Sequence, residues 1–474
     1  MLSKLSKTRV VFLILGVILF VIALFRANNL SMTHDECASI FGLIHSDNYL
    51  FLFNKGEWLT ANNHWLNTMS FQFFHLLFGM KALALRFGSV LMAPIFTYAT
   101  YFICKKLDLD FYIQILVAAL LLTSPILLDY FSLARGYGMA ITFVMTSLAF
   151  ILAYLDGNNK SALIGFVVSA ILSTLSIFSN IIFYFVFCGV LALLLWRLKK
   201  LTKSFFIITA IGLIVLAILT YIPISALSKA DEFRWGTDIL TDSFASYFSE
   251  FNHHQKYMGK PEILVGVFGT FIALAIIAAF VFLSRKPNSL KEEFFVFISM
   301  AFLGFILSML ITNLALNAKF PIDRKTLIYL PFFGLIIALY ADLLLSEGMK
   351  KFVGIVVGGF LFFHFYKSLN MNGTWEWWYD ANTEELVKNI EDLQKDVPAK
   401  VGVHWMFLPA SNYYNHFFYE DKLELIHYTN GDVINESLDY YLIFMGDYEP
   451  FREKFDILEE RPASQQLLIK KKSQ

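Results

Sequence analysis

The stretch "SMTHDECASIFG" (31–42) places two adjacent carboxylates, Asp35 and Glu36, directly after a long apolar segment. A carboxylate in this position can act as a general base that removes the proton of an attacking hydroxyl group. "THDE" also fits a capping box, in which Thr33 caps a helix and Glu36 reaches back to the backbone N–H of the cap. Asp35 is therefore the first candidate for the base and Glu36 the second, although a helix N-terminus would favour either charge without any catalysis.

The glycine-rich stretch "LARGYG" (133–138) contains the most informative cation, Arg135. A guanidinium group can bind a phosphate through two parallel hydrogen bonds, and the neighbouring glycines allow the backbone to approach a ligand closely. Tyr137 is a candidate lining residue of the same site, and Asp129 is a candidate partner of the arginine. The alternative is that Arg135 only extends towards the phosphates of the surrounding lipid.

A second group of cations, Lys319, Arg324 and Lys325, lies in "NAKFPIDRKTLIYLPFF" (317–333), at the expected outer start of a helix. A helix N-terminus repels cations, and the positive-inside rule disfavours them in an outer loop. A bound anion would explain their presence, so Arg324 and Lys325 are predicted to bind a phosphate. Pairing with Asp323 or with a lipid headgroup is the alternative.

Two further stretches have the pattern of helices that lie at a membrane surface. In "NNHWLNTMSFQFFHLLFG" (62–79), apolar residues recur at helical spacing, and His64 and Asn63 stand at the entrance. These two side chains either contact a substrate or are ordinary loop residues at headgroup depth. The stretch 237–254 is also amphipathic, and it either covers a cavity or rests on lipid.

The composition shows which elements must position these residues: 57% of the 474 residues are hydrophobic, 16% are charged, and 51 are phenylalanine. Apolar blocks of roughly 17 to 25 residues are long enough to cross the hydrocarbon core of a membrane as helices. We therefore expect an all-α polytopic membrane protein with about eleven transmembrane helices. They are expected near 10–26, 82–103, 111–128, 138–155, 161–179, 181–196, 204–225, 263–283, 294–314, 327–345 and 351–367, and the pair around Asn180 could instead be one bent unit.

Lysine and arginine recur in alternate short loops, such as the "WRLKK" run (196–200), which predicts that the N-terminus is cytoplasmic. The first span is then a retained signal anchor in a bacterial cytoplasmic (inner) membrane. The unusual polar residues fall in four outer loops, 27–81, 129–137, 226–262 and 315–326. Because the middles of the spans carry almost no ionisable groups, chemistry at the outer membrane surface is favoured over transport.

Residues 368–474 differ in character from the spans and are expected to form a small extracytoplasmic α/β domain beside a transmembrane domain of residues 1–367. "TEELVKNIEDLQKD" and "SNYYNHFFYE" have the pattern of helices. "KVGVHWMFL", "KLELIHY", "LDYYLIFMG", "KFDILEER" and "QQLLIKKK" have the pattern of strands. The domain has no phosphate-binding glycine loop, which favours a role in acceptor binding or support.

Taken together, the "DE" pair, "NNHWLNT", "LFGMKALALRFGSVL", "SPILLDYFSLARGYG" and "PIDRKTLIYLPFF" resemble the polytopic glycosyltransferases of the GT-C fold. The similarity is to the family 39-type enzymes, such as protein O-mannosyltransferases and aminoarabinose transferases, and it covers about residues 1–345. Many relatives have a proline after the histidine of the first loop, where this chain has Trp65. The resemblance implies a sugar donor linked to a polyprenyl phosphate, with inverting transfer on the outer side of the membrane.

For an enzyme of this family, the acceptor is a lipid, a polysaccharide or a protein. The reaction requires no cofactor, and a divalent ion near Asp35 is left open as an alternative. No metal site is predicted, and the formal net charge of zero gives no reason to expect nucleic-acid binding. Two alternatives stay open. A flippase or transporter of lipid-linked glycans would predict polar groups at the midplane and symmetry between halves, whereas a glycan polymerase or ligase could use the same arginines.

Overall fold

The computed structural model describes residues 7–44, 60–253, 255–393 and 398–472. Contacts divide the chain into two compact units. We call the first the helical unit; it consists of Met1–Leu24, Leu50–Met69 and Gly88–Leu369. We call the second the mixed unit; it consists of Phe25–Tyr49, Ser70–Phe87 and Asn370–Gln474.

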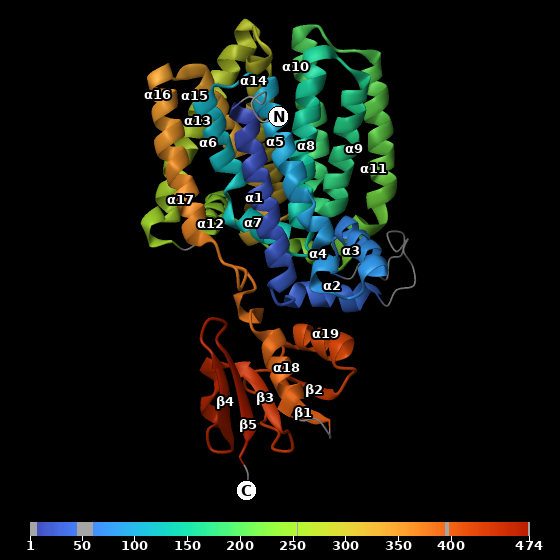
Figure 1. Ribbon diagram of the computed structural model, residues 1–474. Coiled ribbons are helices and arrows are strands. Elements are labelled where there is room, and N and C mark those ends of the chain that lie inside the picture. The colour runs from blue at the N-terminus through green and yellow to red at the C-terminus, as the bar shows by residue number, and fades with distance from the viewer. Residues whose placement is uncertain (1–6, 45–59, 254, 394–397, 473–474) are drawn as a thin grey trace. The chain divides into compact units, whose positions relative to one another are not determined.

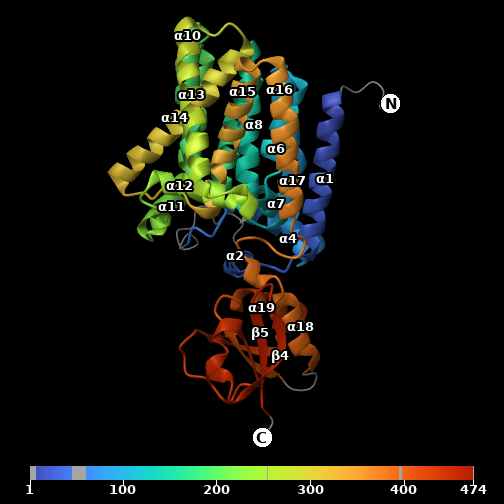
Figure 2. The same cartoon turned by 90° about the vertical axis from the view of Figure 1, so that its left-hand side faces the viewer.

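Long apolar helices make up the helical unit, and Figures 1 and 2 show many of them running side by side. Neighbours in the sequence are also neighbours in space here, since α9 packs against α8, α10 and α11. The helices are α1 (Lys7–Asn29), α5 (Met92–Lys106), α6 (Phe111–Leu122), α7 (Pro125–Ser132), α8 (Gly136–Gly157), α9 (Lys160–Ser176), α10 (Ile181–Leu198), α11 (Lys203–Lys229), α12 (Leu240–Asn252), α13 (Pro261–Arg285), α14 (Leu290–Leu316), α15 (Leu330–Leu344), α16 (Glu347–Phe352) and α17 (Gly358–Ser368).

Within the described residues, nine helical stretches are long and apolar enough to cross a membrane. The pair α6 and α7, bent by 55°, would make a tenth. The expected multi-pass helical fold is therefore confirmed, although fewer than the expected eleven spans reach this length. The difference lies at α9, which was expected over 161–179 and has only 17 residues.

The two spans expected around Asn180 are separate helices. Ile177 has an extended backbone (φ −147°, ψ 116°) that ends α9, and a 3₁₀ turn, η4 (Phe178–Asn180), leads into α10. The side-chain amide of Asn180 donates a hydrogen bond to Ser173 Oγ at 2.9 Å. This bond joins the start of α10 to the end of α9 across the break in the backbone hydrogen bonds.

The stretch expected to be an outer loop, 129–137, is mostly helical. Ser124 accepts a hydrogen bond from the backbone N–H of Leu127 and so caps α7, and Pro125 follows at the first helical position, where no N–H is needed. Helix α7 then continues to Ser132, and α8 begins at Gly136. Only three residues remain between these helices, because the cap restarts the helix immediately after the bend.

The mixed unit contains a five-stranded sheet of order β2-β1-β3-β5-β4. Strands β2, β1 and β3 are parallel, whereas β5 pairs antiparallel with both β3 and β4. All five strands and both helices predicted from the C-terminal sequence are confirmed. The elements are β1 (Ala399–His404), β2 (Leu423–Tyr428), β3 (Tyr440–Phe444), β4 (Phe455–Arg461), β5 (Gln466–Lys471), α18 (Thr383–Leu393) and α19 (Leu408–Phe418).

Alternate residues of the strands face two separate cores, as the period of two in a strand requires. Tyr440 and Leu442 of β3 face one core, and Tyr441 and Ile443 face the other. The first core also contains residues of α2 (His34–Ile44), α3 (Trp65–Phe78) and α4 (Ala82–Val90). The first loop and the C-terminal sheet thus share one core, and the division of the chain at 367/368 remains a prediction.

Candidate functional site

A cavity of about 20 Å³ in the helical unit is lined by Arg324, Lys325 and Tyr137, three residues that the sequence analysis selected as site candidates. Arg324 Nε donates a hydrogen bond to Tyr137 Oη at 3.0 Å, and its guanidinium carbon lies 5.9 Å from the centre of the tyrosine ring. A hydrogen bond and a cation–π contact together fix the direction of the guanidinium group. The cavity therefore presents an oriented cation, which suits the binding of an anion.

The cations of the second group do not stay together. Arg324 and Lys325 lie on η7 (Asp323–Tyr329), and Lys325 Nζ donates to the backbone carbonyl of Trp235 at 3.0 Å. Lys319 instead forms a salt bridge with Asp238, whose side chain is 71% exposed. Lys319 thus belongs to a surface ion pair. Only Arg324 and Lys325 of this group line the cavity.

Arg135 is the N-cap residue of α8 and is only 1% exposed. Its Nη1 donates a hydrogen bond to the backbone carbonyl of Asn62 at 3.2 Å. Because so little of the side chain is exposed, its burial argues against the alternative in which Arg135 only extends towards the surrounding lipid. The arginine instead joins the start of α8 to the segment that contains His64.

His64 lies at the centre of this arrangement, edge-on to Tyr137 with the ring centres 5.1 Å apart. Burial lowers the pKa of His64 well below its usual value, and the positive charges of Arg135 and Arg324 lower it further, against a hydrogen bond to the Ser176 carbonyl. The imidazole is therefore neutral at pH 7. Its Nε2 has no hydrogen-bond partner among the described residues, so Nδ1 is the nitrogen that donates to Ser176. Nε2 is then an acceptor, suited to a ligand hydroxyl.

Gly136 allows this close packing. A Cβ atom at position 136 would lie 2.3 Å from the carbonyl oxygen of Ser176 and 2.8 Å from Cβ of His64. Any other residue would therefore displace the histidine or the end of α9. The "LARGYG" motif contributes a close backbone contact as well as a cation and a tyrosine.

Asn63 and Asp129, the remaining substrate-cleft candidates of the helical unit, are both buried. Asn63 Oδ1 accepts a hydrogen bond from Thr68 Oγ1 at 3.1 Å, which links the residue to the first turns of α3. Asp129 lies in the middle of α7. Its pairing with Arg135 stays a prediction.

The predicted capping box of the mixed unit is confirmed. Glu36 Oε2 accepts from the backbone N–H of Thr33 at 3.0 Å, and Thr33 Oγ1 accepts from the backbone N–H of Glu36 at 3.4 Å. Glu36 also forms a two-bond salt bridge with Arg86, at 2.8 and 2.7 Å, in which both side chains are fully buried. These contacts support the structural explanation of Glu36, because they occupy both of its carboxylate oxygens.

Asp35 is half-buried in the first turn of α2. It belongs to the mixed unit, whereas Arg135 and Arg324 belong to the helical unit. The convergence of this acid and these two cations on one cleft therefore remains a prediction.

The sequence analysis missed the role of Asp380, which is only 1% exposed. Its Oδ2 accepts a hydrogen bond from the backbone N–H of His34 at 2.6 Å, directly before Asp35. Burial raises the pKa of Asp380 well above its usual value, and the nearby charges of Asp35 and Glu36 raise it further, while hydrogen bonds from His34 and Thr383 oppose the rise. A single aspartate after "WEWWY" has no local pattern that could have revealed this.

By its fold, the chain is a multi-pass helical membrane protein with an α/β unit and a cation-lined cavity. No family model matches it, and no curated protein matches it significantly. It is similar to two crystal structures of ArnT from Cupriavidus metallidurans, bound to undecaprenyl phosphate (12% identity, TM-score 0.46) and in the apo state (11% identity, TM-score 0.43). Each similarity covers 98% of both chains.

Proposed function

We propose that this protein is a membrane glycosyltransferase that moves a sugar from a polyprenyl-phosphate donor to an acceptor hydroxyl on the extracytoplasmic face. The observation that carries the proposal is the cavity of the helical unit, where Arg324 and Lys325 lie with Tyr137 beside apolar residues. A polyprenyl phosphate needs cations at headgroup depth and an apolar surface for its tail. The resemblance of the sequence to GT-C glycosyltransferases supports the same assignment.

In the proposed reaction, the acceptor oxygen attacks the anomeric carbon as the bond from that carbon to the phosphate oxygen breaks. Asp35 accepts the acceptor proton, and the polyprenyl phosphate leaves with the bonding electron pair. Attack from the face opposite the leaving group inverts the anomeric carbon, through a transition state with oxocarbenium character. Arg135 and Arg324 stabilise the leaving phosphate more strongly as its negative charge grows.

His64 contributes to binding in this scheme. Its neutral ring offers Nε2 as an acceptor close to the two arginines, so it suits a hydroxyl of the donor sugar better than the phosphate. Glu36 has a supporting role, because its pairing with Arg86 holds the start of α2 on which Asp35 lies.

The proposed orientation has a cytoplasmic N-terminus in a bacterial inner membrane and places the mixed unit outside. The basic short loops of the sequence support it, since lysine and arginine favour the cytoplasmic side. The acceptor is a lipid, polysaccharide or protein hydroxyl.

A donor panel tests the proposal. Purified full-length protein in nanodiscs is incubated with undecaprenyl phosphate carrying single sugars and, separately, with the matching diphosphates, and released undecaprenyl lipids are quantified. We expect turnover of at least one monophosphate donor. Turnover of diphosphates alone would favour a glycan polymerase or ligase, and movement of intact donor across the bilayer without turnover would favour a flippase.

A further inference from the structure

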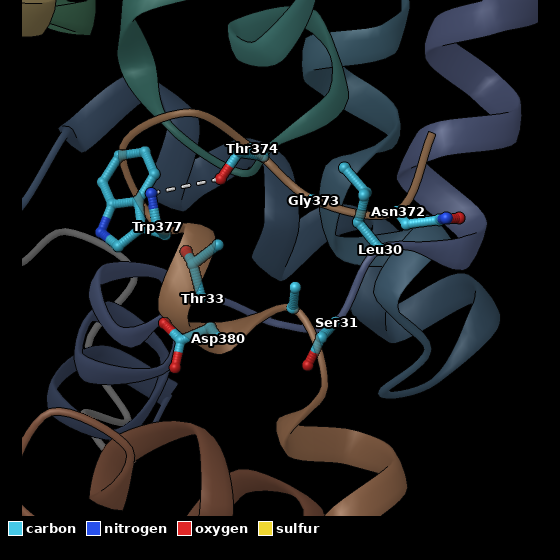
Figure 3. A pocket seen from close by; sticks show the side chains of 9 residues that line it. Leu30, Ser31, Thr33, Asn372, Gly373, Thr374, Trp377 and Asp380 are labelled. Carbon is cyan, nitrogen blue, oxygen red and sulfur yellow. Dashed lines mark hydrogen bonds between the residues drawn. The ribbon is translucent and has the colours of Figure 1, made fainter. Parts of the chain in front are cut away.

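A second cavity lies in the mixed unit, between residues that directly precede α2 and the segment that leads into α18 (Figure 3). Its volume is about 10 Å³, which is room for about one water molecule or one hydroxyl group, and it is partly open to the surface. Five polar side chains and one indole line the cavity, and these residues are Ser31, Thr33, Asn372, Thr374, Asp380 and Trp377.

Asp380 is the unusual member of this lining. Its Oδ2 accepts a hydrogen bond from the His34 N–H, and Thr383 also bonds the carboxyl group, but Oδ1 is buried and has no hydrogen-bond partner among the described residues. Leaving a buried carboxylate oxygen without a partner costs on the order of 1–3 kcal/mol, and such atoms in native proteins usually mark a bound water, ion or ligand. Asp380 Oδ1 is therefore the polar atom of this lining that would be stabilised by a hydrogen bond from a water or a ligand.

Three of the other polar side chains are already engaged. Thr33 Oγ1 donates to Glu36, Thr374 Oγ1 accepts from the backbone N–H of Trp377, and Ser31 Oγ accepts from the backbone N–H of Glu384. One open oxygen cannot satisfy a metal ion, which needs several ligands, or an ammonium group, which carries three donors. A hydroxyl group fits, because it pairs with a carboxylate as a donor and with a protonated carboxyl group as an acceptor.

We infer that this cavity is the subsite that holds a hydroxyl group of a carbohydrate acceptor, with Asp380 as the residue that binds it. The inference rests on the proposed function. Asp380 also holds the backbone N–H of His34, the residue before Asp35, so a hydroxyl bound here is close to the segment that carries the proposed base. The hydroxyl-rich and indole-containing lining suits a sugar better than a lipid chain.

Binding is tested separately from catalysis. The probe is methyl α-D-glucopyranoside, measured by saturation-transfer NMR on the full-length protein in nanodiscs, with cyclohexyl methyl ether as a probe of similar size without hydroxyl donors. We expect saturable binding of the glucoside and none of the ether. Asp380→Asn keeps an oxygen for the His34 N–H but replaces the second carboxylate oxygen by an NH₂ group, which cannot accept the proton of a ligand hydroxyl, so it should weaken glucoside binding about 10- to 100-fold.

Two further variants serve as controls for misfolding. Ala381→Leu fills the cavity without changing the carboxylate and should also abolish binding, whereas Asp421→Asn, at a side chain that is 61% exposed, should leave it unchanged. Equal binding by folded wild type, Asp380→Asn and Ala381→Leu would overturn the inference, as would binding of the ether as strongly as the glucoside. Failure of every donor in the transfer assay would instead reject the proposed function, whatever the binding result.

Discussion

The helical unit and the mixed unit differ in the sign of the buried charge at their candidate sites. In the helical unit, burial lowers the pKa of His64, and the positive charges of Arg135 and Arg324 lower it further. In the mixed unit, the carboxylate of Glu36 is fully paired with Arg86, whereas Asp380 forms no salt bridge among the described residues. One unit thus concentrates positive charge and the other retains an acidic group; in the proposed reaction the first suits the leaving phosphate and the second suits the hydroxyl nucleophile.

The largest expected effect tests the acidic side of this comparison. Asp35→Asn removes the proposed base and should lower turnover by roughly 10²–10⁴-fold while the protein still inserts and folds. Initial rates with the best monophosphate donor measure it. The matched control is Asp242→Asn, an exposed acid in the first turn of α12, which should retain wild-type rates. Near-normal turnover by Asp35→Asn would remove this residue from the base role.

Breaking the paired charge should affect stability rather than chemistry. Arg86→Met leaves Glu36 buried without its cation and should destabilise the mixed unit by about 3–5 kcal/mol, seen as a lower unfolding temperature in detergent. Lys400→Ala, which breaks an exposed pair at 3.6 Å, should cost less than about 1 kcal/mol. The double variant Arg86→Met/Glu36→Met should recover part of the loss; no recovery would mean that Arg86 acts through its backbone contacts instead.

The close contact at Gly136 allows a test of the arginine-containing site of the helical unit. Gly136→Ala would push His64 or the end of α9 away and should lower turnover by about 10²-fold, since displacements near 1 Å have effects of this size. Gly189→Ala is the control, because a Cβ there meets nothing within 4 Å. Wild-type kinetics in Gly136→Ala would show that the position of His64 is unimportant for transfer.

Arg135→Lys retains the charge but loses the planar fork. The KM for the donor should rise about 10-fold or more, as expected when a charged hydrogen bond is lost, with little change in the KM for the acceptor. Arg234→Lys, at a side chain that is 60% exposed, serves as the control. Unchanged donor kinetics in Arg135→Lys would assign Arg135 to a purely structural role at the start of α8.

The smallest expected effect is a pH dependence of stability. The unfolded chain protonates His64 near its usual pKa of about 6.5, whereas the folded protein keeps it neutral, so stability should fall as the pH drops below that value. The loss between pH 7.5 and 5.5 should be about 1 kcal/mol, and His64→Gln should reduce it. Identical pH profiles of unfolding for the two proteins would mean that His64 titrates normally in the fold.

Local patterns in the sequence predicted most of the secondary structure. The strands of the C-terminal region follow a period of two, the spans follow their apolar length, and "THDE" specifies the capping box between Thr33 and Glu36. Arg324, Lys325 and Tyr137 were selected as site candidates because a cation at an outer helix start and a glycine-rich turn are both unusual; the three residues line one cavity, and their roles stay predictions. The helix that replaces the expected loop 129–137 was missed, since the cap at Ser124 restarts the helix after the bend.

The sequence by itself determined that this is a multi-pass membrane protein with a small α/β region, because apolar length and periodicity are properties of neighbouring residues. Only the tertiary structure decided that Glu36 pairs with Arg86, 50 positions away, and that Asp380 bonds His34, 346 positions away. These pairs form because folding removes water from both partners at once, and nothing local in the chain records which groups will share that burial.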